Sequence, residues 1–312
     1  MTRATPFRER AHLRFLTPQA APENTYVIRA RTAWRFAPKE RVRHTGVASS
    51  ARASLLLQHL GMPTPPLIWV REWQSHLGLK THFISVEKYM QGEAINVANP
   101  THTRALIRCI SQMHANTSDK YGLPGKTHNP SAAFMENHLR YVFLRRISRA
   151  NKEPDITLKN TGITALWNLL LGHARAAYRS IPYTRLIHGD INPGNFILLD
   201  KNEVAVLDFD SLRYDQFSPE LIRAMLQSSG NPESAKANWQ HYFQHSGVLS
   251  WHDFKRSAGL AFTLNLLSTP RLIKNPNDSI KIISTLTDLL GNEPDETEWT
   301  DIMRIYRYTD AS

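Results

Sequence analysis

The sequence has little of several features that define common classes of protein. Its 312 residues include one cysteine, Cys109, so no internal disulfide can form, which indicates a reducing compartment. No apolar run approaches the roughly 18 residues that a membrane-spanning helix needs, and the N-terminus lacks the apolar segment of a signal peptide. We therefore expect a cytoplasmic protein without a membrane span.

The first 52 residues have few acidic residues, and no glycine precedes Gly46. Eleven lysines and arginines minus three glutamates give this segment +8 of the total charge of +11. The missing glycines exclude a Gly-rich phosphate loop from residues 1–45. The basic excess favours an anionic partner, such as a nucleotide, nucleic acid, a phosphorylated glycolipid or an anionic membrane surface, or else serves as a solvated face. Because no recognition motif accompanies the charge, we do not expect nucleic-acid binding.

The chain divides into a β-rich part and a helical part. Strand-like segments at residues 11–16, 25–30, 66–73 and 82–90 surround one predicted helix at 49–60, which Gly61 and Pro63 end. Helical periodicity then dominates, at residues 101–114, 132–149, 162–178, 218–227, 231–245, 251–267 and 277–291. Cys109 lies among the apolar positions of the first of these helices, so we expect its thiol at the core. We place the boundary at 90/91.

The only strand-like piece of the helical part lies within residues 185–213, where Asp and Asn residues concentrate. Two strands, 195–200 and 203–210, are expected to form a hairpin. Asp190 precedes Asn195 by five residues, in a loop turned by Pro193 and Gly194, and Asp208 ends the second strand. Three oxygen donors would then converge, which is the order that kinase-type sites use for the acceptor hydroxyl and Mg²⁺. Ordinary turn chemistry is the alternative.

Two motifs here, "HGDINPGN" at 188–195 and "VLDFD" at 206–210, resemble those of the aminoglycoside phosphotransferase and choline kinase-like family. The resemblance implies an α+β, two-lobed, protein-kinase-like fold, with a small β-rich nucleotide-binding lobe (1–90) and a larger helical lobe for catalysis and acceptor binding (91–312). Gly189, where protein kinases have an arginine, is typical of this small-molecule branch.

The resemblance also implies a role for each site residue. Asp190 would orient and deprotonate the acceptor hydroxyl, and Asn195 and Asp208 would hold Mg²⁺ on the phosphates of ATP. Asp210 would assist Asp208 or cap the following turn, and His188 would brace the catalytic loop. The backbone between Glu87 and Tyr89 would receive the adenine. Asp200 and Asp215 are expected to be turn and surface residues.

The predicted phosphate-binding residues depart from the family pattern. Kinases of this fold pair a strand lysine with a glutamate on the next helix, whereas "YVIR" places Arg29 at the lysine position, with Trp34 or Arg35 there in an alternative register. The helix offers Ser50, Arg52 or Ser54 and no glutamate. The sequence thus predicts an ATP- and Mg²⁺-dependent O-phosphotransferase, with a pseudokinase or scaffold as the alternative.

The N-terminal segments carry a second resemblance, which bears on the acceptor. The segments "FRERAHLRF" and "TYVIRA" and the turn at 61–65 are similar to those of lipopolysaccharide core kinases, which implies a sugar hydroxyl on an anionic glycolipid and a peripheral position at the inner face of a membrane. A small-molecule acceptor is the other possibility. The basic segment at 145–149 could hold an anionic acceptor if it borders the cleft. His241 and His245 have the spacing of a metal pair but lack the glutamate that hydrolytic zinc sites use.

Overall fold

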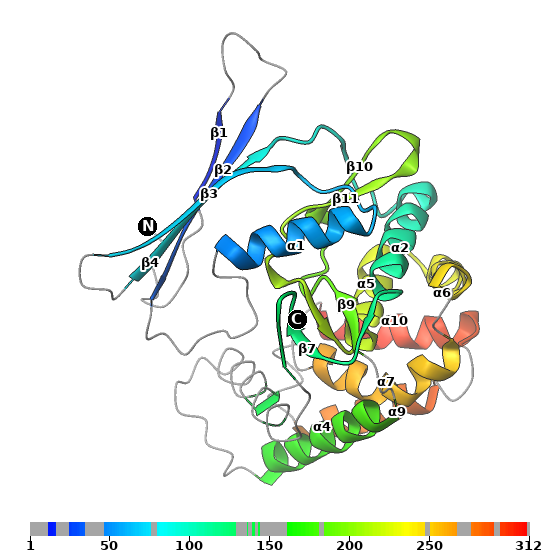
Figure 1. The fold of residues 1–312 in the computed structure, drawn as a ribbon. Coiled ribbons are helices and arrows are strands. Elements are labelled where there is room, and N and C mark those ends of the chain that lie inside the picture. Colours follow the sequence, from blue (N-terminus) through cyan, green and yellow to red (C-terminus); the bar gives the residue numbers. More distant parts are fainter. Residues whose placement is uncertain are drawn as a thin grey trace, which may run out of the picture.

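The computed structural model has a small antiparallel sheet at one end and a larger helical part at the other (Figure 1). The structure describes residues 12–16, 25–34, 47–75, 80–128, 136, 139–140, 143, 161–180, 184–246, 250–266, 276–289 and 294–310. This architecture confirms the predicted α+β fold class. The division at 90/91 stays a prediction, although the first sheet ends at Lys88 and the next strand begins at Glu93.

The first sheet has four strands in the order β1-β2-β4-β3. They are β1 (His12–Leu16), β2 (Tyr26–Trp34), β3 (Leu67–Gln74) and β4 (Lys80–Lys88). Along β4 every second residue is buried, namely Phe83, Ser85 and Glu87, as expected for a strand with one face turned inward. Two of these three buried residues, Ser85 and Glu87, are therefore polar, and they lie toward the C-terminal end of β4.

Helix α1 (Val47–His59) lies between the sheet and the helical part (Figure 1). Its residues Ala53 and Leu57 are fully buried in the main hydrophobic core, and Gly61, with a φ of +69°, ends the helix as predicted. The Pro63 carbonyl oxygen accepts a hydrogen bond of 2.9 Å from the Val206 amide. The segment after α1 is therefore attached to the hairpin of the catalytic motifs.

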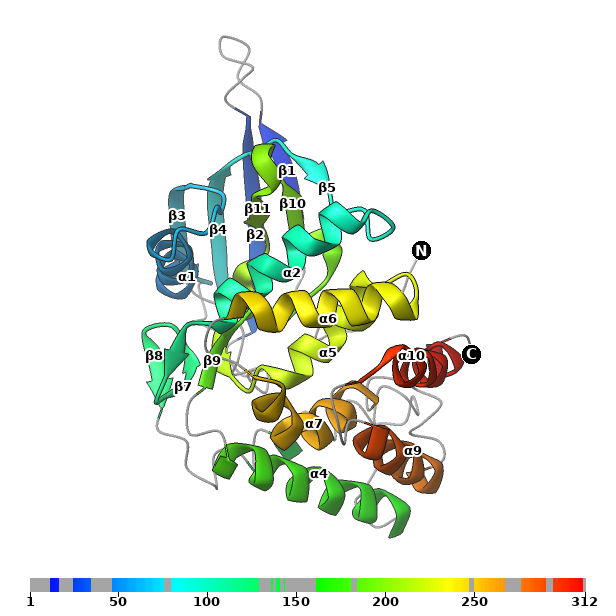
Figure 2. The ribbon, with the colours of Figure 1, turned by 90° about the vertical axis from the view of Figure 1, so that its right-hand side faces the viewer.

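The helical part contains α2 (Pro100–His114), α4 (Thr161–Ser180), α5 (Ser218–Ser228), α6 (Pro232–Ser246), α7 (Trp251–Leu266), α9 (Pro276–Leu289) and α10 (Glu296–Asp310). Helix α2 runs beside α6, and α4 packs against α7 and α9 (Figure 2). The buried Trp239 ring contacts the rings of Phe243, Trp251, Phe254 and Trp299. The predicted helix at 132–149 falls mostly outside the described residues.

Two further sheets lie in this part. The predicted hairpin is confirmed: β10 (Phe196–Leu198) and β11 (Val204–Val206) are antiparallel, and β5 (Glu93–Ala94) joins them. The expectation that this hairpin is the only β structure of the helical part was wrong. A five-stranded sheet is formed by β6 (Thr117–Ser118), β7 (Tyr121–Leu123), β8 (Lys126–His128), β9 (Thr184–Ile187) and β12 (Arg213–Asp215). Strands this short show too few positions for an alternating pattern.

Among the described residues, no helix combines the length and the apolar character that crossing a membrane requires.

Candidate active site

The segment carrying Asp190 follows β9 and enters a short 3₁₀ helix, η1 (Pro193–Asn195). The Asn192 side chain caps η1 by accepting a hydrogen bond of 3.0 Å from the Gly194 amide. Asn195 Nδ2 donates to the Asp190 carbonyl oxygen at 2.8 Å, and both side chains are partly exposed. This bond closes the loop and sets the two predicted functional residues side by side.

Asp208 is brought to the same place by the hairpin. The amide of Leu207 donates to the Asn195 carbonyl oxygen at 2.8 Å, and His188 Nε2 lies 3.0 Å from the Leu207 carbonyl oxygen. Asp208 has a left-handed backbone, with φ 42° and ψ 52°, which is uncommon for a residue with a side chain and is found preferentially at functional sites. The structure therefore gathers Asp190, Asn195 and Asp208 in one place.

Asp210 and Tyr89 are two further predicted site residues. Asp210 lies in the 3₁₀ helix η3 (Phe209–Ser211), and its side chain is outside the described part. Tyr89 is 46% exposed, and its amide donates to the Thr25 carbonyl oxygen at 2.8 Å. The Lys88 amide is likewise bonded to Pro66, at 2.9 Å. Neither of these two amides is free to donate to an adenine.

Glu220, near the start of α5, braces the loop that carries Asp190 from within the core. Its carboxylate accepts the His188 amide at 2.8 Å and the Gly189 amide at 2.6 Å, and His114 Nε2 lies 3.1 Å away. His114 is in turn 2.7 Å from the Tyr242 hydroxyl. Sequence reasoning missed Glu220 because an acid in the first turn of a helix is common and carries no distinctive signal.

The pKa of Glu220 reflects these contacts. Burial by itself raises the pKa of the carboxyl, but the hydrogen bond from His114, the charges of His114 and His188 and the Gly189 amide lower it to about 2. Glu220 is therefore a carboxylate at neutral pH, and it holds two successive amides immediately before Asp190.

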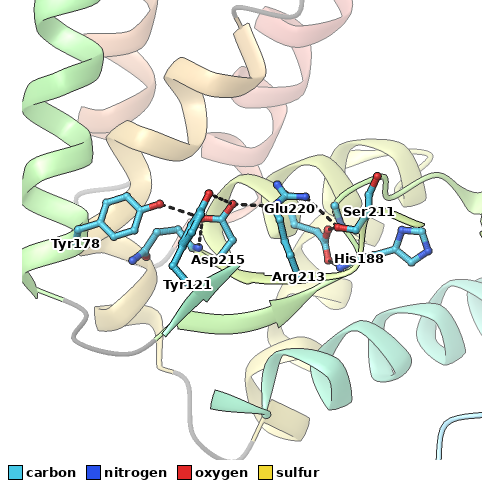
Figure 3. Close-up of polar contacts among 9 residues, drawn as sticks. Tyr121, Tyr178, His188, Ser211, Arg213, Asp215 and Glu220 are labelled. Atoms are coloured by element: carbon cyan, nitrogen blue, oxygen red, sulfur yellow. Dashed lines mark hydrogen bonds and ion pairs between the residues drawn. The ribbon is translucent and has the colours of Figure 1, made fainter. Parts of the chain in front are cut away.

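A second buried network surrounds Asp215 (Figure 3). Asp215 accepts hydrogen bonds from Tyr121 at 3.2 Å, Tyr178 at 3.0 Å and Arg213 Nε at 3.0 Å, and its side chain also caps the Gln216 amide at 2.7 Å. Asp215 is only 8% exposed, so its prediction as a surface residue was wrong. The sequence does not show the two tyrosines that enclose Asp215, because they come from the distant segments β7 and α4. Asp200 is exposed in the turn η2 (Asp200–Asn202), as predicted.

Arg29 links the first sheet to this site. Its Nε lies 3.3 Å from Glu87 Oε2, and its Nη1 lies 3.5 Å from Asp208 Oδ1. Of the alternatives at this position, Trp34 pairs with Lys80 at the far end of β2, and Arg35 is outside the described residues. Sequence reasoning considered only the backbone of Glu87 and missed its side chain.

The remaining candidates lie away from this cluster or outside the described residues. The ring centroids of His241 and His245 are 4.1 Å apart on α6. Among the described residues no group of three His, Cys, Asp or Glu side chains could hold a metal ion. The basic segment at 145–149 falls outside the described residues.

Residues 14–253 match the sequence profile of the phosphotransferase enzyme family known as APH. Because the match spans most of the chain, the protein belongs to this family of phosphotransferase enzymes. The predicted family is thereby confirmed. No curated protein is significantly similar to the chain.

Solved structures agree on the fold. The choline kinase LicA of Streptococcus pneumoniae is 14% identical, with a TM-score of 0.51 over 88% of this chain and 94% of that one. A putative fructosamine-3-kinase of Haemophilus somnus is 13% identical, with a TM-score of 0.51 over 92% of each chain. At such identities the likeness shows the protein-kinase-like fold and leaves the acceptor open.

Proposed function

We propose that the protein is an ATP- and Mg²⁺-dependent O-phosphotransferase that acts on the hydroxyl of a small molecule or of a glycolipid sugar. The observation that carries this proposal is the hydrogen-bonded linkage of Asp190, Asn195 and the residue before Asp208. Asp190 is the base: it takes the proton of the acceptor hydroxyl as the acceptor oxygen bonds to the γ-phosphorus. The bond from that phosphorus to the bridging oxygen breaks, and ADP leaves.

The donor set suits Mg²⁺. The ion prefers oxygen ligands and shares them with phosphates, and here Asp208 offers a carboxylate. Asn195 uses its Nδ2 for the Asp190 carbonyl, so its amide oxygen is the atom left for a metal. Bound there, Mg²⁺ would neutralise charge on the phosphates. Arg29, 3.5 Å from Asp208, would add a second positive group beside them.

The pseudokinase alternative rested on the missing acidic partner of Arg29. Glu87 supplies an acid within 3.3 Å, so that objection is weaker. For the acceptor, the basic residues of the first segment favour an anionic glycolipid, and contact with an anionic membrane surface would follow from the same charge. This choice rests on charge and on the resemblance to lipopolysaccharide core kinases.

The test compares Asp190→Asn with the unaltered enzyme. We expect the variant to bind ATP with Mg²⁺ normally, seen as an unchanged ligand-dependent rise in melting temperature, and to lose ATP turnover by at least about a thousandfold. Turnover is measured as ADP release in the presence of a panel of alcohols that includes aminoglycosides, choline and lipid-linked sugars. Unchanged turnover would remove Asp190 as the base, and a flat melting response of the unaltered enzyme would favour the scaffold.

A further inference from the structure

The side chain of Glu87 takes the place of the helix acid that α1 lacks. Helix α1 (Val47–His59) contains no Asp or Glu, so the ion pair between strand and helix that this fold commonly uses cannot form from that helix. We infer that Glu87, on strand β4, is the positioning residue for the phosphate-binding Arg29. The inference rests on the proposed function, since it gives Arg29 its task.

The strand register explains how the two side chains meet. In the antiparallel pair of β2 and β4, Arg29 lies opposite Ser85 and Val27 lies opposite Glu87. Residues two apart on one strand share a face, so Glu87 is the diagonal neighbour of Arg29 on the inward face. A diagonal separation is short enough for a long side chain such as arginine to span.

Burial makes this pair more than a surface contact. The Glu87 and Arg29 side chains are 8% and 15% exposed, and Ser85 Oγ donates to Glu87 Oε1 at 3.3 Å. A carboxylate held this far from water needs a cation beside it, because its desolvation is costly. Neutralising Glu87 would therefore leave the guanidinium without the carboxylate that holds its Nε edge.

The shape of arginine fits the two contacts. The guanidinium is a planar fork with donors on separate edges, and here the Nε edge faces Glu87 while Nη1 reaches Asp208. A lysine has a single ammonium nitrogen and cannot present two separate edges in this way. The Glu87 carboxylate thus lies as an ion pair at the stem side of the fork, without a hydrogen bond to Nε, while Nη1 lies on the Asp208 side of the site.

The pair of Arg29 and Glu87 differs in one functional respect from an ion pair between a strand and a helix. Arg29 and Glu87 belong to adjacent strands of one sheet, so the pair does not depend on where α1 lies. Arg29 is held ready for phosphates whenever the sheet is folded.

The experiment measures binding of AMP-PNP with Mg²⁺ by isothermal titration to the full chain. We expect Glu87→Gln to raise Kd about tenfold, in line with the loss of one charge-assisted contact, and Glu87→Asp to recover part of the loss. Arg29→Lys should also weaken binding, and in the Arg29→Lys background Glu87→Gln should have less than half its effect, because the two residues act as one unit. Glu72→Gln, an exposed carboxylate on β3, is the matched control and should leave Kd unchanged.

The outcomes separate the two proposals. A purely structural role would lower the melting temperature of ligand-free Glu87→Gln but leave the Kd of the folded protein unchanged, which would overturn the positioning role alone. Fully additive effects of the two substitutions would overturn it as well. An unaltered protein that binds no AMP-PNP would overturn the proposed function and this inference together. If Glu87→Gln does not fold, Glu87→Asp takes its place. Its Kd for AMP-PNP is then measured alone and in the Arg29→Lys background, and an unchanged Kd or fully additive effects would overturn the positioning role.

Discussion

The guanidinium of Arg213 lies against Gly189, in the space that a side chain at residue 189 would fill. Arg213 comes from β12, where its Nε bonds to Asp215 at 3.0 Å and its Nη1 to the Ser211 carbonyl oxygen at 3.1 Å. Gly189 has a φ of +79°, a conformation that favours glycine. The glycine of the catalytic motif is therefore required by its backbone and by its neighbour at once.

Replacing this glycine should destabilise the protein. A Cβ in Gly189→Ala would collide with the Arg213 guanidinium and the Ser211 carbonyl oxygen, and the positive φ adds strain. We expect a loss of about 2–4 kcal/mol in the free energy of unfolding, measured with urea. Gly194→Ala is the control from the same loop, because a Cβ there meets no atom closer than 3.6 Å. Equal stability of the two variants would contradict this explanation.

The buried pair of Arg213 and Asp215 gives a second prediction. Asp215→Asn keeps a side chain of similar size but removes the charge that balances Arg213, while Tyr121 and Tyr178 still approach it. Leaving one buried charge unpaired costs about 3–5 kcal/mol of unfolding free energy. Asp200→Asn, in an exposed turn, should change it by less than about 0.5 kcal/mol. Urea unfolding of both variants tests the difference, and a small effect at Asp215 would mean that the pair is not needed.

The sequence predicted the parts of the site that are local in the chain. The order of Asp190, Asn195 and Asp208 was visible because all three residues flank one hairpin and lie close together in the sequence. The partners of Arg29 and of the catalytic loop were not visible, because strand pairing and helix packing bring Glu87 and Glu220 to them from distant segments. Local sequence patterns indicate turns and the periodicity of helices and strands. They do not indicate which carboxylate from a distant segment a buried donor will contact.

The single cysteine offers a probe of folding. Cys109 is 6% exposed within the core, as its place in an amphipathic helix predicted. Burial, and to a smaller extent the charge of the nearby Glu220, raises the pKa of its thiol to about 12. A thiol with this pKa is protonated and unreactive at neutral pH. We expect no modification by a thiol reagent at pH 8 in the folded protein and one modified thiol per chain in urea, counted by absorbance. Rapid labelling without denaturant would contradict the buried position.

Glu220 should make stability depend on pH at the acidic end. Its pKa in the folded protein is about 2, below its ordinary value of 4.5, so folding favours the charged carboxylate. The contribution of the Glu220 carboxylate to the free energy of unfolding is complete above pH 4.5 and is lost as the pH falls from 4.5 toward 2. In Glu220→Gln this proton equilibrium is absent. His188 and Gly189 donate to different carboxylate oxygens, so one of the two amides keeps an acceptor and the other meets the side-chain NH2 group. We therefore expect the unaltered protein to exceed the variant in unfolding free energy at pH 7 and this difference to shrink between pH 4.5 and pH 3. Urea unfolding of both proteins across that range measures it, and a difference that stayed constant with pH would show that Glu220 does not brace the loop as a carboxylate.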